Sequence, residues 1–282
     1  MDIKYLTKKL KLIVFDLDGT LLNDRGQVGS ETKRLVELLQ SEGLSFSFAT
    51  GRLHSAVVDY AEQLNLNAPI ISLDGCLIKN HSDKKIIFES AVPVKYVVKA
   101  LSLAGELNLT VALCHDEAIY YTSKNSGIPE STDKLGANFE QVKSYDEYLN
   151  KTLEILISGR NYRIMKYFFN KMSFPYSFGL TKAFYKSYNY HNLYFIEIRK
   201  KGSSKGEGLK RLASYLKIKM NEAAVLGDWY NDISMFRLDS LKVAMANAVD
   251  QIRDSADIIL NRTNNEDGTA EFLELVFKNR KS

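Results

Sequence analysis

A continuous apolar run, Leu12–Phe15, ends directly in two carboxylates, Asp16 and Asp18. Branched and aromatic residues without polar alternation are typical of a strand buried on both faces of a parallel sheet. Gly19 and Thr20 then end the predicted strand. Residues two apart in an extended segment project to the same side, so Asp16 and Asp18 can face one ligand. This segment therefore predicts an acidic site at the end of a buried strand.

Strands and helices alternate after this first strand. The apolar spacing predicts a helix from Ser30 to Gly43 and another over 55–64, with strands at 44–49 and 69–73. This rhythm returns after Gly202, where two helices and three strands are predicted at 205–216, 231–236, 223–226, 242–245 and 256–260. Such alternation indicates an α/β fold with a doubly wound, Rossmann-like parallel sheet.

The residues between these two halves differ in composition. They are richer in Tyr, Phe, Asn and Lys, and alternating runs at 85–89, 118–122 and 193–198 predict half-exposed strands of an antiparallel sheet. Helices are predicted at 94–106 and 161–172. The expected organisation is a core made of residues 1–83 and 198–282, interrupted by an α+β domain over 84–197.

The composition limits the classes of partner. The chain has 282 residues, a net charge of +4 and a pI near 8.8, and apart from an amino-terminal group its Lys and Arg residues are scattered. A nucleic-acid partner is not expected, because such proteins usually carry a denser basic stripe. Cys76 and Cys114 are too few for a disulfide framework or a thiolate metal site. The run Leu12–Phe15 is too short for a signal peptide or a membrane span, so we expect a cytoplasmic protein without a membrane partner.

Four of the predicted strands end in residues that can bind a ligand or take part in catalysis. Ligands bind at the carboxyl ends of the strands in open α/β sheets. The residues found there are Asp16 and Asp18, Thr50, Asp74, and Asp228 with Asp232. So many carboxylates cannot all ionise side by side without a large penalty, which a hard cation would relieve. Mg²⁺ is the candidate, since it takes one or two carboxylates and leaves room for a phosphate oxygen.

Positive charge for a phosphate is also present. Lys205 and the turn Thr50-Gly51 supply a cation and hydrogen-bond donors for phosphate oxygens. No cluster of His or Cys favours a softer metal. Each of these residues taken alone has an ordinary structural explanation, such as a turn or the first residue of a helix. The set, in this order, indicates a phosphoryl-transfer site.

These segments resemble the motifs of the haloacid dehalogenase (HAD) superfamily of phosphohydrolases. Asp16–Thr20 looks like the first motif, Thr50 the second, Lys205 the third and Gly227–Asp232 the fourth. Two later segments are similar to the Cof-type subfamily: Met245–Ala248 and Asn265–Gly268. The resemblance implies a cap domain, of the C2 type, inserted between the second and third motifs.

The resemblance also implies a role for each matching residue. Asp16 would attack phosphorus and form an aspartyl-phosphate, while Asp18 would protonate the leaving alcohol and then deprotonate water. Thr50, Gly51 and Lys205 would hold the phosphoryl oxygens.

The other matching residues would hold the metal and support the site. Asp16, the backbone carbonyl of Asp18, and Asp228 would bind Mg²⁺. Asn231 would help bind phosphate, and Asp232 would orient Lys205. The implied activity is a phosphatase acting on small phosphorylated metabolites such as sugar phosphates.

Several alternatives stay open. Family members often carry Asn-Gly where this chain has Asp74-Gly75; the acid can alter substrate preference, but a turn is favoured because Asp-Gly is a common turn pair. A phosphomutase or phosphotransferase would use the same chemistry. A dehalogenase would leave Asp18 without a leaving oxygen to protonate, and a phospho-accepting regulatory module would lack Asp18 and an inserted cap. The sequence specifies neither the substrate nor the oligomeric state.

Overall fold

The apolar run at the start of the sequence forms β1 (Leu12–Phe15), whose four residues are completely buried. The computed structural model describes residues 2–125, 128, 136–187 and 190–281. β1 is part of a five-stranded sheet with the order β14-β13-β12-β1-β2, in which all neighbours are parallel. The other strands are β2 (Ser45–Phe48), β12 (Ala223–Gly227), β13 (Leu241–Ala244) and β14 (Ile258–Ile259). The predicted parallel sheet is confirmed.

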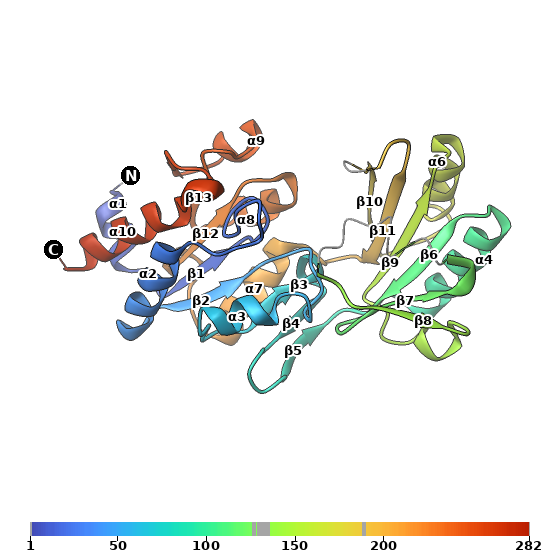
Figure 1. Ribbon diagram of the computed structural model, residues 1–282, viewed down its shortest axis with the longest axis horizontal. Coiled ribbons are helices and arrows are strands. Elements are labelled where there is room, and N and C mark those ends of the chain that lie inside the picture. Colours follow the sequence, from blue (N-terminus) through green and yellow to red (C-terminus); the bar gives the residue numbers. More distant parts are fainter. Residues whose placement is uncertain (1, 126–127, 129–135, 188–189, 282) are drawn as a thin grey trace. The chain divides into compact units, whose positions relative to one another are not determined.

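Helices cover both faces of this sheet (Figure 1). On one face, Leu12 and Val14 share a hydrophobic core with Leu209 and Leu212 of α7 (Lys205–Tyr215) and with α8 (Ile233–Phe236) and α9 (Asp250–Arg253). Ile13 and Phe15 point to the opposite face because side chains alternate along a strand. On that side lie α1 (Ile3–Lys8), α2 (Ser30–Ser41) and α10 (Gly268–Lys281), and α10 contacts both of the other helices.

A second, three-stranded sheet continues the chain after α3 (Val58–Gln63). Its order is β3 (Ile70–Ser72), β4 (Leu77–Lys79) and β5 (Ile86–Glu89), with β3 and β4 antiparallel. The prediction that 85–89 belongs to the inserted domain's sheet is wrong, because β5 pairs with β4. A local hairpin accounts for this: the Asn80 N–H donates to the Lys85 carbonyl at 2.9 Å. Alternating polar and apolar residues predict a half-exposed strand, but they do not specify which strand pairs with it.

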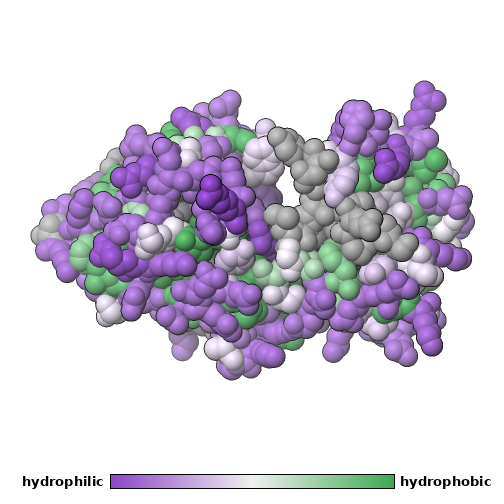
Figure 2. Space-filling model, in the orientation of Figure 1, coloured by the Kyte–Doolittle hydropathy of each residue, from purple (hydrophilic) through white to green (hydrophobic). Residues whose placement is uncertain are grey.

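The chain forms two compact units. Unit 1 contains the described residues up to Gly51, Val58–Phe88, and those from Ser204 onward, and unit 2 contains those of Arg52–Val57 and Glu89–Ser203. Figure 2 shows that the visible face of unit 1 is mainly hydrophilic, with small and separate apolar areas. Within the ranges that the structure describes, no helix has the length and apolar character needed to span a membrane.

Unit 2 is an α+β unit with its own sheet. The strand order is β10-β11-β9-β6-β7-β8, and all the neighbouring pairs are antiparallel except β7 with β8. The strands are β6 (Thr110–Cys114), β7 (Ile119–Thr122), β8 (Phe139–Val142), β9 (Glu154–Gly159), β10 (Leu180–Lys186) and β11 (Tyr194–Lys200). Helices α4 (Val94–Glu106) and α6 (Tyr162–Lys171) supply Val97, Ala100, Met165 and Phe168 to a core with Ile155 and Ile157 of β9.

Candidate active site

The predicted site residues of unit 1 lie where strands end and helices begin. Asp16 follows β1, Thr50 follows β2 after one residue, Asp228 follows β12, and Lys205 is the first residue of α7. All four are buried, as is Asp232. Lys205 contacts both Asp16 and Asp232. Asp232 also contacts the backbone of Asp228.

Lys205 connects two of the carboxylates. Its side chain is completely buried, and Nζ donates to Asp16 Oδ1 at 2.5 Å and to Asp232 Oδ1 at 2.7 Å. Burial opposes the charged ammonium, but Asp16, Asp232 and Asp74 outweigh it and hold the pKa of Lys205 well above its ordinary value. Lys205 is therefore a permanent cation in the metal-free protein.

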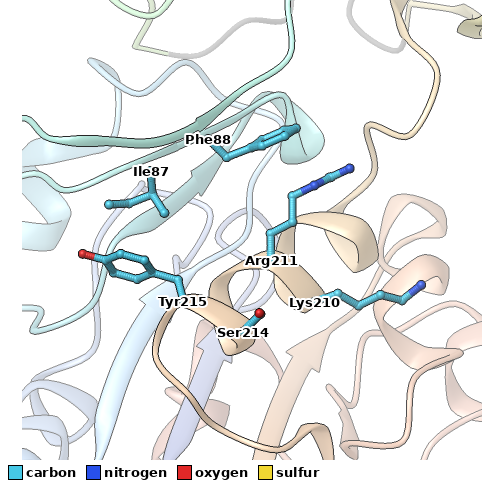
Figure 3. A pocket seen from close by; sticks show the side chains of 6 residues that line it. All are labelled: Ile87, Phe88, Lys210, Arg211, Ser214 and Tyr215. Atoms are coloured by element: carbon cyan, nitrogen blue, oxygen red, sulfur yellow. The ribbon is translucent and has the colours of Figure 1, made fainter.

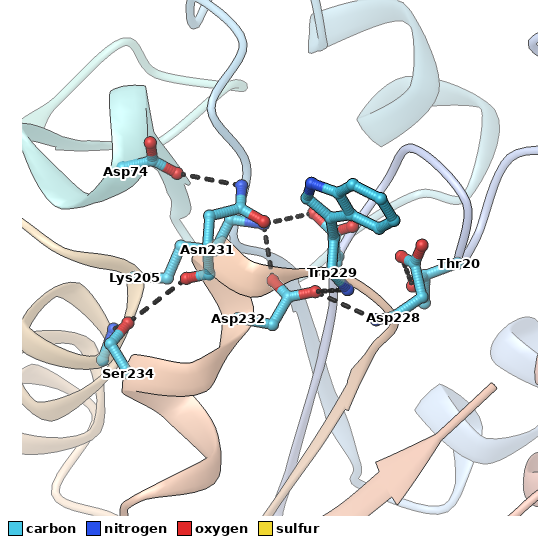
Figure 4. A network of polar contacts seen from close by, with 10 residues as sticks. Thr20, Asp74, Lys205, Asp228, Trp229, Asn231, Asp232 and Ser234 are labelled. Carbon is cyan, nitrogen blue, oxygen red and sulfur yellow. Dashed lines mark hydrogen bonds and ion pairs between the residues drawn. The ribbon is translucent and has the colours of Figure 1, made fainter. Parts of the chain in front are cut away.

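Asp232 anchors both Lys205 and the turn that carries Asp228. Its Oδ2 accepts hydrogen bonds from the backbone N–H groups of Asp228 (3.0 Å) and Trp229 (3.1 Å), as Figure 4 shows. With Oδ1 held by Lys205, each oxygen of this buried carboxylate has a donor. The arrangement agrees with the implied role of Asp232 in orienting Lys205.

Asp16 and Asp228 carry more negative charge than Lys205 can balance. Burial raises the pKa of Asp16 well above its usual range; Asp232 and Asp228 add to the shift, and Lys205 opposes it. Burial likewise raises the pKa of Asp228 to about 7, again with a contribution from Asp232. Ligand oxygens of Asp16, Asp228 and Asp232 lie within 4.8 Å of one another. Buried, closely spaced oxygens with raised pKa values fit a hard divalent cation.

Close packing joins the first motif to the fourth. Gly19 has φ +80°, and a Cβ atom there would lie 2.4 Å from Asp228 Oδ2. Only glycine fits, because both the conformation and the space exclude a side chain. The neighbouring Thr20 Oγ1 donates to Asp228 Oδ1 at 2.8 Å, and Asn247 Nδ2 donates to the Gly19 carbonyl at 2.8 Å.

Sequence reasoning gave no role to Thr20 or Asn247. Both lie inside segments that the resemblance quotes, so membership of a motif was the available signal. Their partners lie 208 and 228 residues away, which no local pattern reveals.

Asp18 differs from the other acids in being exposed. It forms an isolated bridge with Leu22, and it does not belong to the group of close carboxylates that Asp16 forms. An exposed carboxyl next to a buried one suits a group that must exchange protons with a leaving group and with water. Asp18 is predicted to bind the metal through its backbone carbonyl, and the positions of the carboxylates do not test that prediction.

Thr50, Gly51, Asp74 and Asn231 form a second group near Lys205. The Thr50 N–H donates to the Ile71 carbonyl, and the Thr50 carbonyl accepts from the Asp74 N–H, both at 2.9 Å. Asn231 is exposed, and its Nδ2 donates to Asp74 Oδ1 at 3.4 Å (Figure 4). Asp74 lies in a 3₁₀ turn, Leu73–Gly75 (η1), as expected for an Asp-Gly pair.

The tail segment braces the loop after β1. Asp267 Oδ2 accepts from the backbone N–H groups of Glu31 and Thr32 and so caps α2, and Asn264 Nδ2 donates to the Leu22 carbonyl at 2.9 Å. Asn265 Oδ1 accepts from the Asp24 N–H at 2.9 Å. These contacts hold the segment that follows the first motif and do not enter the group of acids.

A separate surface pocket of unit 1 contains none of the predicted residues. It is lined by Ile87, Phe88, Lys210, Arg211, Ser214 and Tyr215 (Figure 3). The Arg211 guanidinium lies 4.0 Å from the Phe88 ring centroid, a stacking contact that already uses the ring. Without a carboxylate in its lining, this pocket lacks the metal ligands of the acidic group.

Comparison with known proteins identifies the family of this chain. A family model for haloacid dehalogenase-like hydrolases matches residues 13–273. The curated relatives include phosphatase YwpJ of Bacillus subtilis (28% identity over 94% of this chain and 99% of that protein). They also include the B. subtilis 5-amino-6-(5-phospho-D-ribitylamino)uracil phosphatase YitU (24% identity over 94% and 97%).

A solved structure shares the fold. A haloacid dehalogenase-like hydrolase from Bacteroides thetaiotaomicron superposes with a TM-score of 0.83 at 25% identity, covering 95% of this chain and 100% of that one. The family match spans both halves of the core and all the motifs described above. The chain therefore belongs to the haloacid dehalogenase-like hydrolases and is an HAD-type phosphatase.

Proposed function

We propose that this chain is a Mg²⁺-dependent phosphatase that hydrolyses small phosphorylated metabolites, such as sugar phosphates, through an aspartyl-phosphate on Asp16. The buried pair of Asp16 and Lys205 beside Asp228 carries the proposal. Lys205 holds Oδ1 of Asp16, and Oδ2 is proposed as the attacking oxygen. The relative that acts on a phosphorylated ribitylamino compound supports a phosphate ester of a sugar-like alcohol.

The reaction has two displacements. Asp16 attacks phosphorus while Asp18 gives its proton to the leaving alcohol oxygen, and the phosphorus–oxygen bond to the alcohol breaks. Water then attacks the same phosphorus and gives a proton to Asp18, and the bond to Asp16 breaks to release inorganic phosphate. In each step one proton passes to or from the Asp18 carboxyl. This side chain is exposed, so both the leaving group and water can reach it.

The remaining polar residues bind the phosphoryl group and the ion. Lys205, Thr50, Gly51 and Asn231 are proposed to hold phosphoryl oxygens. Asp16, the backbone carbonyl of Asp18, and Asp228 would hold Mg²⁺. When bound, the ion neutralises the carboxylates and the charge on the phosphoryl oxygens.

The sequence predicts an insertion over 84–197, and in the structure the inserted part of unit 2 begins at Glu89 and ends at Ser203. We propose that the inserted residues form a cap of the C2 type, the part of the enzyme that selects the leaving group. Its placement between the second and third motifs supports this proposal. The α+β composition of unit 2 agrees with it.

Release of p-nitrophenol from p-nitrophenyl phosphate with Mg²⁺ tests the mechanism. We expect Asp16→Asn to lower kcat by at least about 10³-fold, because the nucleophile is removed. Excess EDTA should abolish turnover of the unmodified enzyme. Asp239→Asn is the matched control, since Asp239 is exposed in the loop before β13, at the amino end of that strand, whereas the site lies at the carboxyl ends of the strands. Full activity of Asp16→Asn would refute the mechanism.

A further inference from the structure

Asp74 is the acid near the site that the proposed reaction does not use. Its backbone N–H donates to the Thr50 carbonyl at 2.9 Å. A Cβ atom on Gly51 would lie 3.4 Å from Asp74 Oδ1, so the carboxylate lies directly beside the phosphate-binding turn. Asp74 is also one of the charges that stabilise the Lys205 ammonium.

The backbone holds Asp74 in an unusual conformation. Leu73, Asp74 and Gly75 have consecutive positive φ angles of 47°, 48° and 86°. Non-glycine residues adopt this region at a cost, and such conformations persist where the surroundings determine them. Here a Cβ on Gly75 would lie 2.2 Å from the carbonyl oxygen of Ser204, the residue before Lys205. The turn is therefore packed against the start of α7, which fixes where Asp74 projects.

The side chain of Asp74 also accepts a hydrogen bond from the Asn231 amide. An ionised carboxylate only accepts hydrogen bonds, so Asn231 turns its NH₂ group to Asp74, at 3.4 Å (Figure 4). Both side chains are accessible, since Asn231 is exposed and Asp74 half-buried. A substrate bound at Thr50 and Lys205 would thus meet a negative acceptor next to its phosphate.

We propose that Asp74 and Asn231 form a leaving-group subsite that admits phosphate monoesters of neutral, hydroxyl-bearing alcohols and rejects esters with a second anionic group. A hydroxyl of the alcohol can donate to the Asp74 carboxylate, whereas a second carboxylate or phosphate is repelled by it. The inference rests on the proposed phosphatase function and narrows its substrate class.

Two esters that differ at one end test the subsite. Glycerol 3-phosphate and 3-phosphoglycerate share a three-carbon chain and a phosphate, but the first ends in a hydroxymethyl group and the second in a carboxylate. We expect the unmodified enzyme to prefer glycerol 3-phosphate by at least about tenfold in kcat/KM, since one close like charge typically shifts an equilibrium by that order.

Asp74→Asn is the informative variant. Asparagine keeps the size, tolerates a positive φ and still accepts a hydrogen bond from Asn231, but it lacks the charge. The preference should fall to about threefold or less, mainly through a lower KM for 3-phosphoglycerate. Asp74→Gly, which also suits the backbone, should lose the preference and raise the KM for glycerol 3-phosphate. The Asp239→Asn control should keep the original ratio, and an unchanged ratio in Asp74→Asn would overturn the proposal.

Binding measurements separate this proposal from the proposed reaction. Calorimetric titration of both esters into Asp16→Asn and into Asp16→Asn/Asp74→Asn requires no turnover. If the added Asp74→Asn change raises the affinity for 3-phosphoglycerate more than that for glycerol 3-phosphate, the subsite is supported. This holds even if the unmodified enzyme hydrolyses neither ester; such a lack of hydrolysis would count against the catalytic proposal alone. Equal changes for the two esters, or no binding of either ester to either protein, would reject the subsite.

Discussion

Gly19 is the residue on which the packing around Asp228 depends most directly. Its φ of +80° disfavours any side chain, and a Cβ would overlap Asp228 Oδ2 at 2.4 Å. We expect Gly19→Ala to displace Asp228 and to lower Mg²⁺ affinity by at least about tenfold, because a proposed ligand loses its position. Isothermal titration with Mg²⁺ measures this change.

Gly43 offers a matched control for that experiment. It has nearly the same backbone angle, φ +85°, but no atom lies within 4 Å of the position of an added Cβ. Gly43→Ala should therefore lower stability by roughly 1–2 kcal/mol through backbone strain and leave Mg²⁺ affinity unchanged. Equal metal affinities in the two variants would show that crowding at Asp228 is unimportant.

The raised pKa of Asp228 predicts how metal binding depends on pH. Burial, helped by Asp232, raises this pKa to about 7 from an ordinary value of 3.8. Between these values the folded, metal-free protein holds a proton that the unfolded chain has released. Its stability should therefore fall as the pH rises from about 4 to about 7.

Metal affinity should change in the opposite direction. Mg²⁺ must displace the Asp228 proton, so the apparent affinity should weaken by at least about tenfold per pH unit as the pH falls below 7. Titrations between pH 5.5 and 8 in buffers of different ionisation enthalpy would detect the released proton. An affinity that is constant over this range would contradict the assignment of Asp228 as a ligand.

The first residue of α7 belongs to the site. Ser204 caps it by accepting a hydrogen bond from the Glu207 N–H at 3.2 Å. Ser204→Ala should cost about 1 kcal/mol of stability and, because Lys205 follows the cap, lower kcat several-fold. Urea unfolding and turnover of p-nitrophenyl phosphate are the two measurements.

Asn161→Ala removes a comparable cap from α6 in unit 2. Asn161 accepts from the N–H groups of Arg163 and Ile164, so a similar loss of stability, about 1 kcal/mol, is expected. If Ser204→Ala and Asn161→Ala lowered kcat equally, the effect would come from stability and not from Lys205.

Elements whose signals are local could be predicted from the sequence. α4 covers Val94–Glu106, as its periodicity indicates, and β1 occupies the predicted run Leu12–Phe15. The partner of β5 was assigned wrongly, because a half-exposed strand of Ile86–Glu89 suits either sheet. A strand pattern reports which face is buried but not which strand lies beside it.

The site shows the same division between local and distant information. A buried strand followed by Asp16 and Asp18 is a local pattern, and it pointed to the acids. The capping of α2 by Asp267, over 235 and 236 residues, is set by tertiary packing and has no counterpart near α2 in the sequence. The hydrogen bond from Thr20 to Asp228 is equally remote. The individual roles of the site residues therefore stay predictions that the variants above must test.

For the whole chain, the division into two units predicts a selective effect of Mg²⁺. The carboxylates near Lys205 all belong to unit 1. An ion at about 100 times its Kd should stabilise the unit that binds it by about 2.7 kcal/mol. Hydrogen exchange should therefore slow in β1 and β12, while β6 and β9 of unit 2 keep their rates. Equal slowing in both units would mean that they open together.

The parallel pairing of β1 with β12 also has a consequence for synthesis on the ribosome. Thr20 and Asp228, which share a hydrogen bond, are 208 residues apart. At translation rates of about 5–20 residues per second, roughly 10–40 s pass between their appearance. Throughout that time the nascent chain carries Asp16 without Asp228, and β6–β11 of the interrupting unit are synthesised within the same interval. A chain that ends before Asp228 therefore has the proposed nucleophile, Asp16, but lacks a complete site.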